Sequence, residues 1–158
     1  MRLQRFTALL LLAILSLLTA HNKTNAQVSS HSSATAHAAQ SYLLVISKPG
    51  DSLLIIDPAT LKTLGRVPTG EGPHEVIAAP DGKTAYVANY GLAGKPGQSL
   101  SLIDLVGKKE IKRIELSDLV RPHGLVEAGG QIYFTAEVSQ SVARYNPRAG
   151  NVDWRVKT

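Results

Sequence analysis

The chain repeats one short pattern at a nearly fixed interval, and this repetition restricts its fold more than any other feature. The clearest copy, residues 72–91, reads GPHEVIAAPDGKTAYVANYG, which is two apolar runs separated by Asp81 and Gly82. An Asp-Gly pair between two such runs predicts a tight turn that joins two strands. Gly82 can adopt the positive φ that a side chain would resist. A second copy, PHGLVEAGGQIYFTAEVS, spans residues 122–139 with a Gly-Gly pair at the turn, so the hairpin recurs.

Landmarks outside the hairpin keep the same spacing. SLLIID at 52–57 returns as SLSLID at 99–104, a step of 47 residues. Further landmarks recur at steps of 47 or 42: Asp57, Asp104 and Asn146; Arg66, Arg113 and Arg155; Tyr86 and Tyr133. A period of about 40–50 residues with four short strands per unit is typical of a β-propeller blade. No stretch after residue 41 keeps a helical period, so we expect an all-β fold.

The repeat divides the chain into about three blades of four antiparallel strands. Residues 74–116 supply one whole blade and residues 123–158 another, whereas residues 41–70 supply a blade without its inner strand. Propellers have about four to eight blades, so we expect an incomplete propeller domain at 41–158, a fragment of a larger, seven-bladed propeller. The alternatives are the assembly of several chains into a ring or a small open array of blades. Because blades bury their flat faces against neighbours, we expect the isolated segment to be unstable or to self-associate through unpaired blade faces.

The same scheme predicts the surroundings of particular side chains. We expect Leu54, Ile56, Val142 and Tyr145 on flanks that have no partner in this chain. We expect Trp154 to pack between blades, because a large aromatic side chain suits such a gap. The Gly/Pro-rich stretch LAGKPGQ, residues 92–98, predicts a loop longer than its counterpart in the first blade, which explains the unequal steps.

The N-terminus has the features of an export signal. A basic start precedes an almost wholly apolar run at 6–18 and a small-x-small cleavage motif at 24–26. The apolar run is too short to cross a hydrocarbon core of roughly 30 Å. We therefore expect residues 1–26 to be a cleaved signal peptide, no stable membrane span afterwards, and a periplasmic or secreted protein. Residues 27–40, rich in Ser, Ala and His, lack the apolar side chains to fold and predict a flexible linker.

Charge and composition exclude several classes of function. Residues 1–26 hold three of the 17 basic side chains and none of the 12 acidic ones, so the remainder carries a formal charge of only +2. No nucleic-acid partner is expected from so small an excess. The chain has no cysteine, which excludes disulfides and cysteine-ligated zinc. It also lacks the GxSxG, HExxH, phosphate-loop and CxxCH motifs, so the sequence requires no cofactor.

His74 and His123 are the leading candidates for a functional site. Each follows a proline at the start of the expected inner strand, which in a propeller lines the central channel. Two imidazoles there could bind a metal or another ligand, or abstract a proton. A histidine copied from blade to blade can instead hold a loop by hydrogen bonds to the backbone, and the recurrence favours this structural role. Glu75, Arg121 and Glu137 are the polar neighbours expected to join a ligand-binding site, the alternative being solvated rim charges.

Other recurring side chains are expected to be structural. Asp57, Asp104 and Asn146 stand at strand-to-turn corners, where such side chains accept hydrogen bonds from nearby backbone N–H groups. The recurring arginines are expected on outer strands, where charge discourages edge pairing. Tyr90 is expected to be an ordinary strand aromatic.

The segment PDGKTAYVANYG, with the SLxxID corners, resembles the YVTN-type β-propeller repeat of YncE-like proteins. The resemblance covers residues 42–158 and implies a propeller. It implies no single activity, because such propellers include binding proteins, sugar-lactone hydrolases and redox-enzyme domains.

The second hairpin also resembles the streptogramin lyases of the virginiamycin B lyase type, through Pro122-His123-Gly124 and Tyr133-Phe134-Thr135-Ala136-Glu137. That resemblance implies His123 as the catalytic base and Glu137 among the Mg²⁺ ligands. The chain departs from the pattern where Arg121 replaces an expected carboxylate and where an Ala interrupts the Thr-Glu pair. We expect an exported scaffold that binds a small molecule or protein without defined catalysis. The alternative is a Mg²⁺-dependent lyase or a lactone hydrolase that uses His123 and Glu137.

Overall fold

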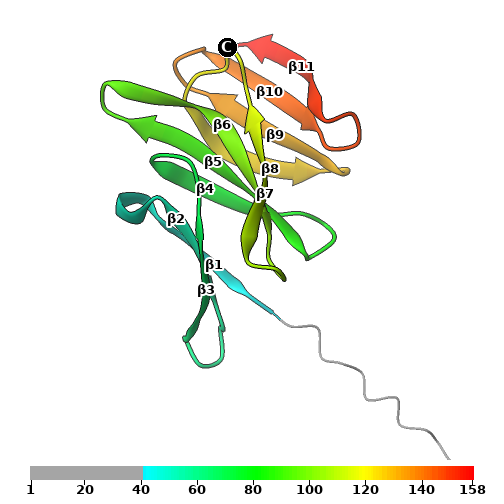
Figure 1. Cartoon of the computed structure of the whole chain (residues 1–158). Helices are drawn as coiled ribbons and strands as arrows, with labels where there is room; N and C mark the ends of the chain where they lie inside the picture. Colours follow the sequence, from blue (N-terminus) through cyan, green and yellow to red (C-terminus); the bar gives the residue numbers. More distant parts are fainter. Residues whose placement is uncertain (1–40) are drawn as a thin grey trace, which may run out of the picture. The chain divides into compact units, whose positions relative to one another are not determined.

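The computed structural model describes residues 41–158, so the predicted signal peptide at 1–26 and linker at 27–40 lie outside the described residues. The described part consists of strands and one 3₁₀ turn, arranged as three antiparallel sheets (Figure 1). The first sheet contains β1 (Leu43–Ser47), β2 (Ser52–Ile56) and β3 (Thr63–Pro68), with the turn η1 (Lys48–Gly50) after β1. The second contains β4 (Pro73–Ala78), β5 (Thr84–Leu92), β6 (Lys95–Asp104) and β7 (Lys109–Glu115). The third contains β8 (Pro122–Ala128), β9 (Gln131–Ala136), β10 (Ser141–Asn146) and β11 (Asn151–Lys157).

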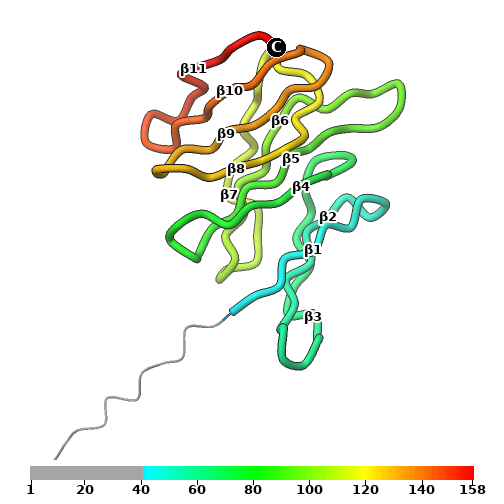
Figure 2. The backbone as a smooth tube through the Cα atoms, turned by 180° about the vertical axis from the view of Figure 1, so that it is seen from behind, coloured from blue at the N-terminus to red at the C-terminus, as the bar shows by residue number. Residues whose placement is uncertain are grey.

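The strands of each sheet follow one another in chain order, as in propeller blades, which confirms the predicted all-β class. The first sheet has no described counterpart of β4 or β8, the first strands of the other two sheets. Strand β4 contacts both β1 and β8, so the three sheets follow one another side by side (Figure 2). Within residues 41–158, no helix is long and apolar enough to cross a membrane.

Local sequence signals explain the turns. At the turn between β4 and β5, Gly82 has a φ of 64°, and one carboxylate oxygen of Asp81 accepts hydrogen bonds from the backbone N–H of Lys83 and Thr84. Asp57, Asp104 and Asn146 each accept a hydrogen bond from the backbone N–H two residues ahead, at 2.8–3.0 Å. The structural role predicted for these three side chains is therefore confirmed.

The middle sheet is covered by apolar side chains on both faces. On β5, Ala85 and Val87 pack toward the first sheet, whereas Tyr86 and Ala88 pack toward the third. Alternation along a strand sends successive side chains to opposite faces, so one strand serves two apolar layers. The layer shared with the first sheet contains Leu53, Ile55, Val67, Ala85, Val87, Ile103 and Leu105. The layer shared with the third sheet is larger and contains Tyr86, Phe134 and Tyr145.

Two side-chain predictions were wrong. Tyr145 is buried with Tyr86, because its side of β10 faces the middle sheet and not the open flank. Trp154 is 43% exposed and contacts Tyr133 edge to face, on the side of the third sheet away from the middle sheet. Leu54, Ile56 and Val142 are half-buried.

The loop predicted at 92–98 is also wrong, because β5 and β6 continue pairing through it. Gly91 lies opposite Pro96 and Leu92 opposite Lys95, after a register shift that begins at Asn89. Gly91 has a φ of 85°, and a Cβ added at Gly97 would lie within 1.9 Å of the Asn89 carbonyl oxygen. Glycine therefore permits a close backbone approach that extends the hairpin.

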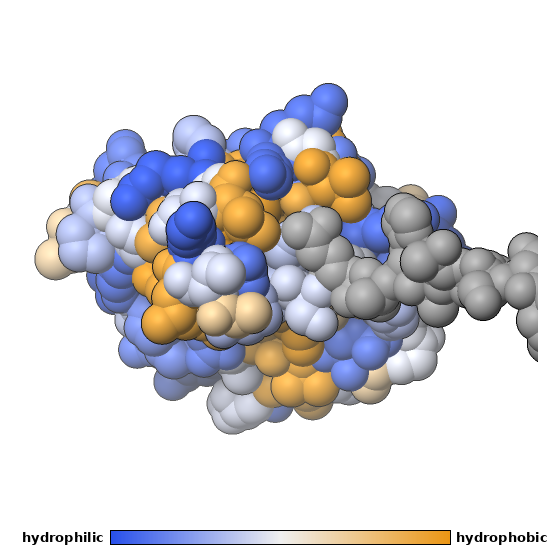
Figure 3. Space-filling view, turned by 90° about the horizontal axis from the view of Figure 1, so that it is seen from below, coloured by the Kyte–Doolittle hydropathy of each residue, from blue (hydrophilic) through white to orange (hydrophobic). Residues whose placement is uncertain are grey.

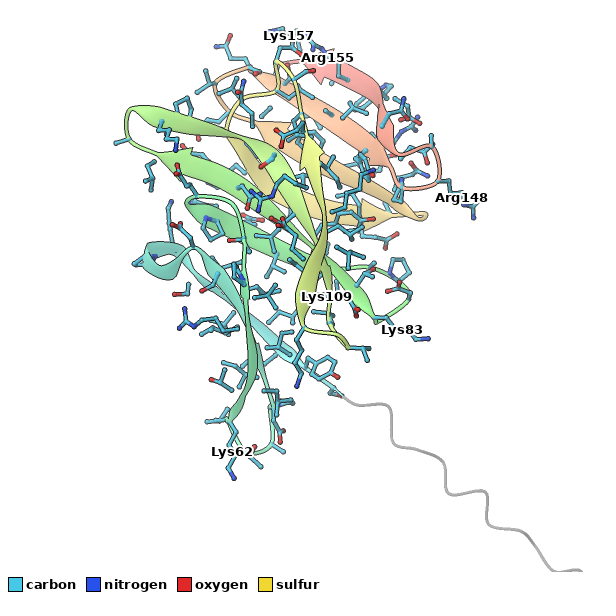
Figure 4. All side chains as sticks on the ribbon, viewed as in Figure 1. Lys62, Lys83, Lys109, Arg148, Arg155 and Lys157 are labelled. Atoms are coloured by element: carbon cyan, nitrogen blue, oxygen red, sulfur yellow. The ribbon has the colours of Figure 1, made fainter. Side chains whose placement is uncertain are left out.

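Charged side chains cover the turns. Lys62, Lys83 and Arg148 lie at three separate hairpin turns and point away from the sheets (Figure 4). Viewed from below, the surface shows several separate apolar patches between hydrophilic regions (Figure 3). The basic side chains at these turns therefore lie apart from one another.

Candidate functional site

His74 and His123 meet at one end of the inner strands. They are the second residues of β4 and β8, two strands that contact each other. Their imidazole rings are 4.0 Å apart between centroids and tilted by 38°. The repeat position that suggested them in the sequence thus places two titratable rings in direct contact.

Glu75 adds a carboxylate to this pair. Its Oε1 lies 3.8 Å from His123 Nδ1, and its Oε2 accepts a hydrogen bond from the backbone N–H of Leu125 at 3.2 Å. One oxygen is thus held by the backbone of the third sheet, and the other faces His123. The three residues His74, Glu75 and His123 form what we call the His–Glu cluster, in which one potential ligand atom of each lies within 4.8 Å of the other two.

A β-bulge explains how two successive residues of β4 reach the same place. Pro73 pairs with Asn89 and Glu75 with Ala88, so His74 is the extra residue between them. A bulge places an additional side chain against the partner strand and redirects its neighbours. The pairing of β8 with β9 also shifts register, between Pro122 and Leu125, where His123 lies. Both histidines therefore occupy irregular positions of their strands.

Tyr90 links this cluster to two further predicted residues. Its ring lies 5.2 Å from the His74 ring and 5.4 Å from the His123 ring. Its hydroxyl donates a hydrogen bond to Glu137 Oε2 and accepts one from Arg121 Nη1 at 3.0 Å. The Arg121 guanidinium also lies 4.7 Å from the centre of the Tyr90 ring. The structure thus brings all five sequence-predicted residues to one end of the inner strands, Arg121 and Glu137 through Tyr90.

Two residues of this site, Tyr90 and Lys48, were missed in the sequence. The Lys48 ammonium lies 5.0 Å from the centre of the Tyr90 ring. Tyr90 precedes Glu137 by 47 residues and follows Lys48 by 42, which are the two steps of the repeat. Lys48, Tyr90 and Glu137 are therefore three copies of one position: Lys48 directly follows β1, Tyr90 lies near the end of β5, and Glu137 directly follows β9. The spacing alone could have identified these three residues. A comparison of residue types does not, because the equivalent positions hold a lysine, a tyrosine and a glutamate.

Burial and neighbouring charge lower the pKa of His74. Desolvation is the main cause, His123 and Lys48 add to it, and the carboxylates of Glu75 and Glu137 oppose it. A lowered pKa favours the neutral imidazole, which keeps a lone pair available for a ligand. The Nδ1 atom of His74 is also buried and has no hydrogen-bond partner among the described residues.

The site opens onto a cavity of about 350 Å³ lined by His123, Thr135 and Glu137. A larger cavity of about 410 Å³ lies between β7 and β11, lined by residues 114–119, 150–152 and 155. No histidine lines that larger cavity, and its lining includes the Arg155–Asp118 ion pair at 2.7 Å. The smaller cavity therefore has imidazole and carboxylate groups beside it, and the larger cavity has no imidazole.

The donor atoms of the His–Glu cluster do not suit Mg²⁺, the ion implied by the lyase resemblance. Magnesium prefers an octahedron of oxygen ligands, whereas this cluster offers two imidazoles and one carboxylate. Among residues 41–158 it is the one group of three potential ligands found. Glu137, the ligand expected from that resemblance, accepts the hydrogen bond of Tyr90.

No protein-family model and no curated protein matches the chain. Solved structures do match, and three of them are propeller-like proteins. Hydrazine synthase from Kuenenia stuttgartiensis superposes with a TM-score of 0.63 at 24% identity over 72% of this chain and 33% of that one. Apo AztD from Citrobacter koseri gives 0.59 at 15% identity, covering 76% of this chain and 32% of that one.

The dihydro-heme d1 dehydrogenase NirN, in complex with DHE, gives a TM-score of 0.57 at 17% identity, over 74% of this chain and 24% of its own length. The chain spans about a third or less of these three structures. Identities below 25% establish the fold alone. The three sheets described here are therefore blades of a β-propeller-type fold.

Proposed function

We propose that this chain belongs to an exported β-propeller of the YVTN kind that binds a ligand at the histidine end of its inner strands. The observation that carries the proposal is the convergence of side chains from three consecutive sheets on one point. Lys48 lies in the turn between β1 and β2 of the first sheet, and His74, Glu75 and Tyr90 belong to the second. Arg121 precedes β8, His123 lies in β8 and Glu137 follows β9, so these three come from the third sheet and its edges. Polar groups that converge beside an open cavity are typical of binding sites.

The geometry supports binding more than catalysis. No hydrogen bond joins His123 to Glu75 in this arrangement, since His123 Nδ1 and Glu75 Oε1 are 3.8 Å apart. The two imidazoles contact each other through their rings. The Tyr90 hydroxyl already donates to Glu137 and accepts from Arg121. These groups form a preorganised surface, and no nucleophile–base pair stands out among them.

Ligand binding is tested by thermal unfolding of the full-length chain in the presence of defined probes. The panel is ZnCl₂, MgCl₂, phosphate, succinate, glucose and tyramine, which together cover cations, anions, sugars and aromatic amines. A compound that binds only the folded state raises Tm. At 100 times its Kd, such a compound adds about 2.7 kcal/mol to the free energy of unfolding. We expect at least one probe to raise Tm by several degrees.

Variants locate the binding. Tyr90→Phe and His123→Ala should remove the rise in Tm. Tyr133→Phe should keep it, because the Tyr133 ring packs against Trp154. If no probe raises Tm, or if the rise survives both site variants, ligand binding at this end of the inner strands is wrong.

Export is tested by fusing residues 1–40 to a phosphatase that is active only after it crosses the inner membrane. We expect activity outside the cytoplasm, and loss of activity when residues 6–18 are deleted. Equal activity with and without the apolar run would contradict export by this segment.

A lactone hydrolase is the second candidate, because His123 and Glu137 line the same cavity of about 350 Å³. In this alternative the His123 imidazole activates water against a lactone carbonyl in that cavity. Hydrolysis of dihydrocoumarin, followed by its absorbance, should then disappear in His123→Ala and persist in His31→Ala. Absence of turnover by the wild-type chain would reject this candidate.

A further inference from the structure

We propose that His74, His123 and Glu75 bind one divalent transition-metal ion, with Zn²⁺ the best suited. The inference rests on the proposed ligand-binding function and names the class of ligand. It starts from the one group of three potential metal ligands among residues 41–158, which are brought together from β4 and β8.

The donor set selects the class of metal. Imidazole nitrogen with one carboxylate oxygen is a common ligand set for Zn²⁺ and is shared by Ni²⁺, Cu²⁺ and Co²⁺, whereas Mg²⁺ and Ca²⁺ require mainly oxygen. The chain has no cysteine, so no thiolate competes for the ion. Three protein ligands leave a fourth tetrahedral position for water or for a small ligand in the adjoining cavity.

The distances are compatible with closure around an ion. Ligand atoms of a tetrahedral Zn²⁺ site lie about 3.3 Å apart, given bonds of about 2.0–2.1 Å. The cluster atoms lie within 4.8 Å of one another, and His123 Nδ1 is already 3.8 Å from Glu75 Oε1. The side chains of His123 and Glu75 are 39% and 42% exposed, so rotation of these partly solvated groups can close the remaining gap.

The surroundings hold the ligands in place. The Leu125 N–H donates to Glu75 Oε2, which leaves Oε1 directed at His123. Outer hydrogen bonds of this kind orient metal-ligating carboxylates. The buried Nδ1 of His74 has no partner among the described residues, and a metal bound there would supply one.

The backbone is shaped for three ligands as well. His74 is the extra residue of a bulge, which allows it and Glu75 to reach one point although they are adjacent in β4. Gly124 follows His123 where Glu75 follows His74, so β8 contributes no side chain at the position equivalent to Glu75. The nearby cations Lys48 and Arg121 lie over the Tyr90 ring. The Glu137 carboxylate accepts a hydrogen bond from the Tyr90 hydroxyl and balances part of the positive charge of Lys48 and Arg121.

The test measures Zn²⁺ binding to the full-length chain by isothermal titration calorimetry, with Co²⁺ absorbance as a report of coordination. We expect one site, a visible tetrahedral Co²⁺ spectrum, and no competition from a hundredfold excess of Mg²⁺. Glu75→Gln and His123→Gln should each weaken Zn²⁺ binding at least tenfold and abolish the Co²⁺ spectrum. The circular dichroism of each metal-free variant should match that of the wild type, which shows that it is folded.

The N-terminal histidines provide the matched control. His31→Ala combined with His37→Ala removes two imidazoles outside the cluster and should leave both readouts unchanged. The inference is wrong if this double variant abolishes binding, or if Glu75→Gln and His123→Gln bind Zn²⁺ as tightly as the wild type.

Failure of the metal inference can be separated from failure of the proposed function. If Zn²⁺ does not bind but an organic probe raises Tm in a Tyr90-dependent manner, the metal inference is overturned and the ligand-binding function stands. If neither Zn²⁺ nor any organic probe binds, both are overturned.

Discussion

At the scale of single residues, Asn89 has a buried side-chain amide whose oxygen and nitrogen both make hydrogen bonds. Its Oδ1 accepts from the Gly70 N–H at 3.1 Å, and its Nδ2 lies 3.0 Å from the hydroxyl oxygens of Ser99 and Ser101. Asn89, in β5, thereby connects Gly70, in the segment that follows β3, to Ser99 and Ser101 of β6. Buried polar groups that lose such partners carry the full cost of desolvation.

Asn89→Ala should therefore lower the free energy of unfolding by about 2–4 kcal/mol, because it leaves a buried N–H and two hydroxyls without this partner. Urea denaturation followed by circular dichroism measures the change. Asn151→Ala, which removes an exposed amide, is the control and should stay within about 0.5 kcal/mol of the wild type. Equal effects of the two substitutions would show that the Asn89 network does not stabilise the fold.

Tyr86 gives a prediction for alkaline pH. Burial, together with Tyr145 and Asp81, raises the pKa of Tyr86 to about 12, from an ordinary value near 10. Between these values the folded state keeps a proton that the unfolded state loses, so stability should fall as the pH rises from 10 toward 12. Denaturant unfolding at pH 9 and pH 11 should show a smaller fall for Tyr86→Phe than for the wild type. A fall of the same size in both proteins would assign the effect to other groups.

At the scale of elements, the segment that enters β4 is fixed by a close approach of two backbones. Gly72 has a φ of 56°, and a Cβ added there would lie 2.3 Å from the Gly91 carbonyl oxygen. The Gly72 N–H donates to Asp51 Oδ1, and its carbonyl accepts from the Tyr90 N–H. Gly72 therefore connects the position of His74 to that of Tyr90.

Gly72→Ala should lower the free energy of unfolding by about 3 kcal/mol or more, because positive φ and a clash with backbone act together. Gly82→Ala is the matched control, since Gly82 has a similar φ of 64° and open space around the added Cβ. It should cost only about 1 kcal/mol. Chemical denaturation of both variants measures the difference, and equal losses would mean that the backbone adjusts freely at Gly72.

The sequence predicted most strands because apolar runs and Gly or Pro turns alternate at short intervals. It did not predict the paired stretch at 92–98, since glycines that permit a close backbone approach have the composition of a loop. The contact between His74 and His123 followed from the repeat. The inclusion of Tyr90 and Lys48 did not, because their equivalence lies in spacing and not in residue type. The bulge that aligns His74 with Glu75 depends on strand register, which no local pattern in β4 specifies.

At the scale of the whole molecule, the three sheets are not equally supported. The middle sheet buries both faces, whereas the first sheet has three strands and shares one apolar layer with the middle sheet. The layer between the second and third sheets includes the large side chains Tyr86, Phe134 and Tyr145. Regions with fewer buried apolar contacts open more readily.

Hydrogen exchange should therefore rank the sheets. Amides of β5 and β6 should exchange most slowly, and those of β1 to β3 clearly faster, when followed by mass spectrometry of peptic peptides. Uniform protection across residues 43–104 would show that the first two sheets open as one cooperative unit.

The shared position of Lys48, Tyr90 and Glu137 has an evolutionary consequence. Duplication of a blade copies a backbone location together with its neighbours, and each copy can then mutate alone without altering the fold. An ammonium, a phenol and a carboxylate become adjacent in this way, although no ancestral blade had to contain all three. New recognition chemistry can thus arise from divergence between copies, with the scaffold itself inherited intact.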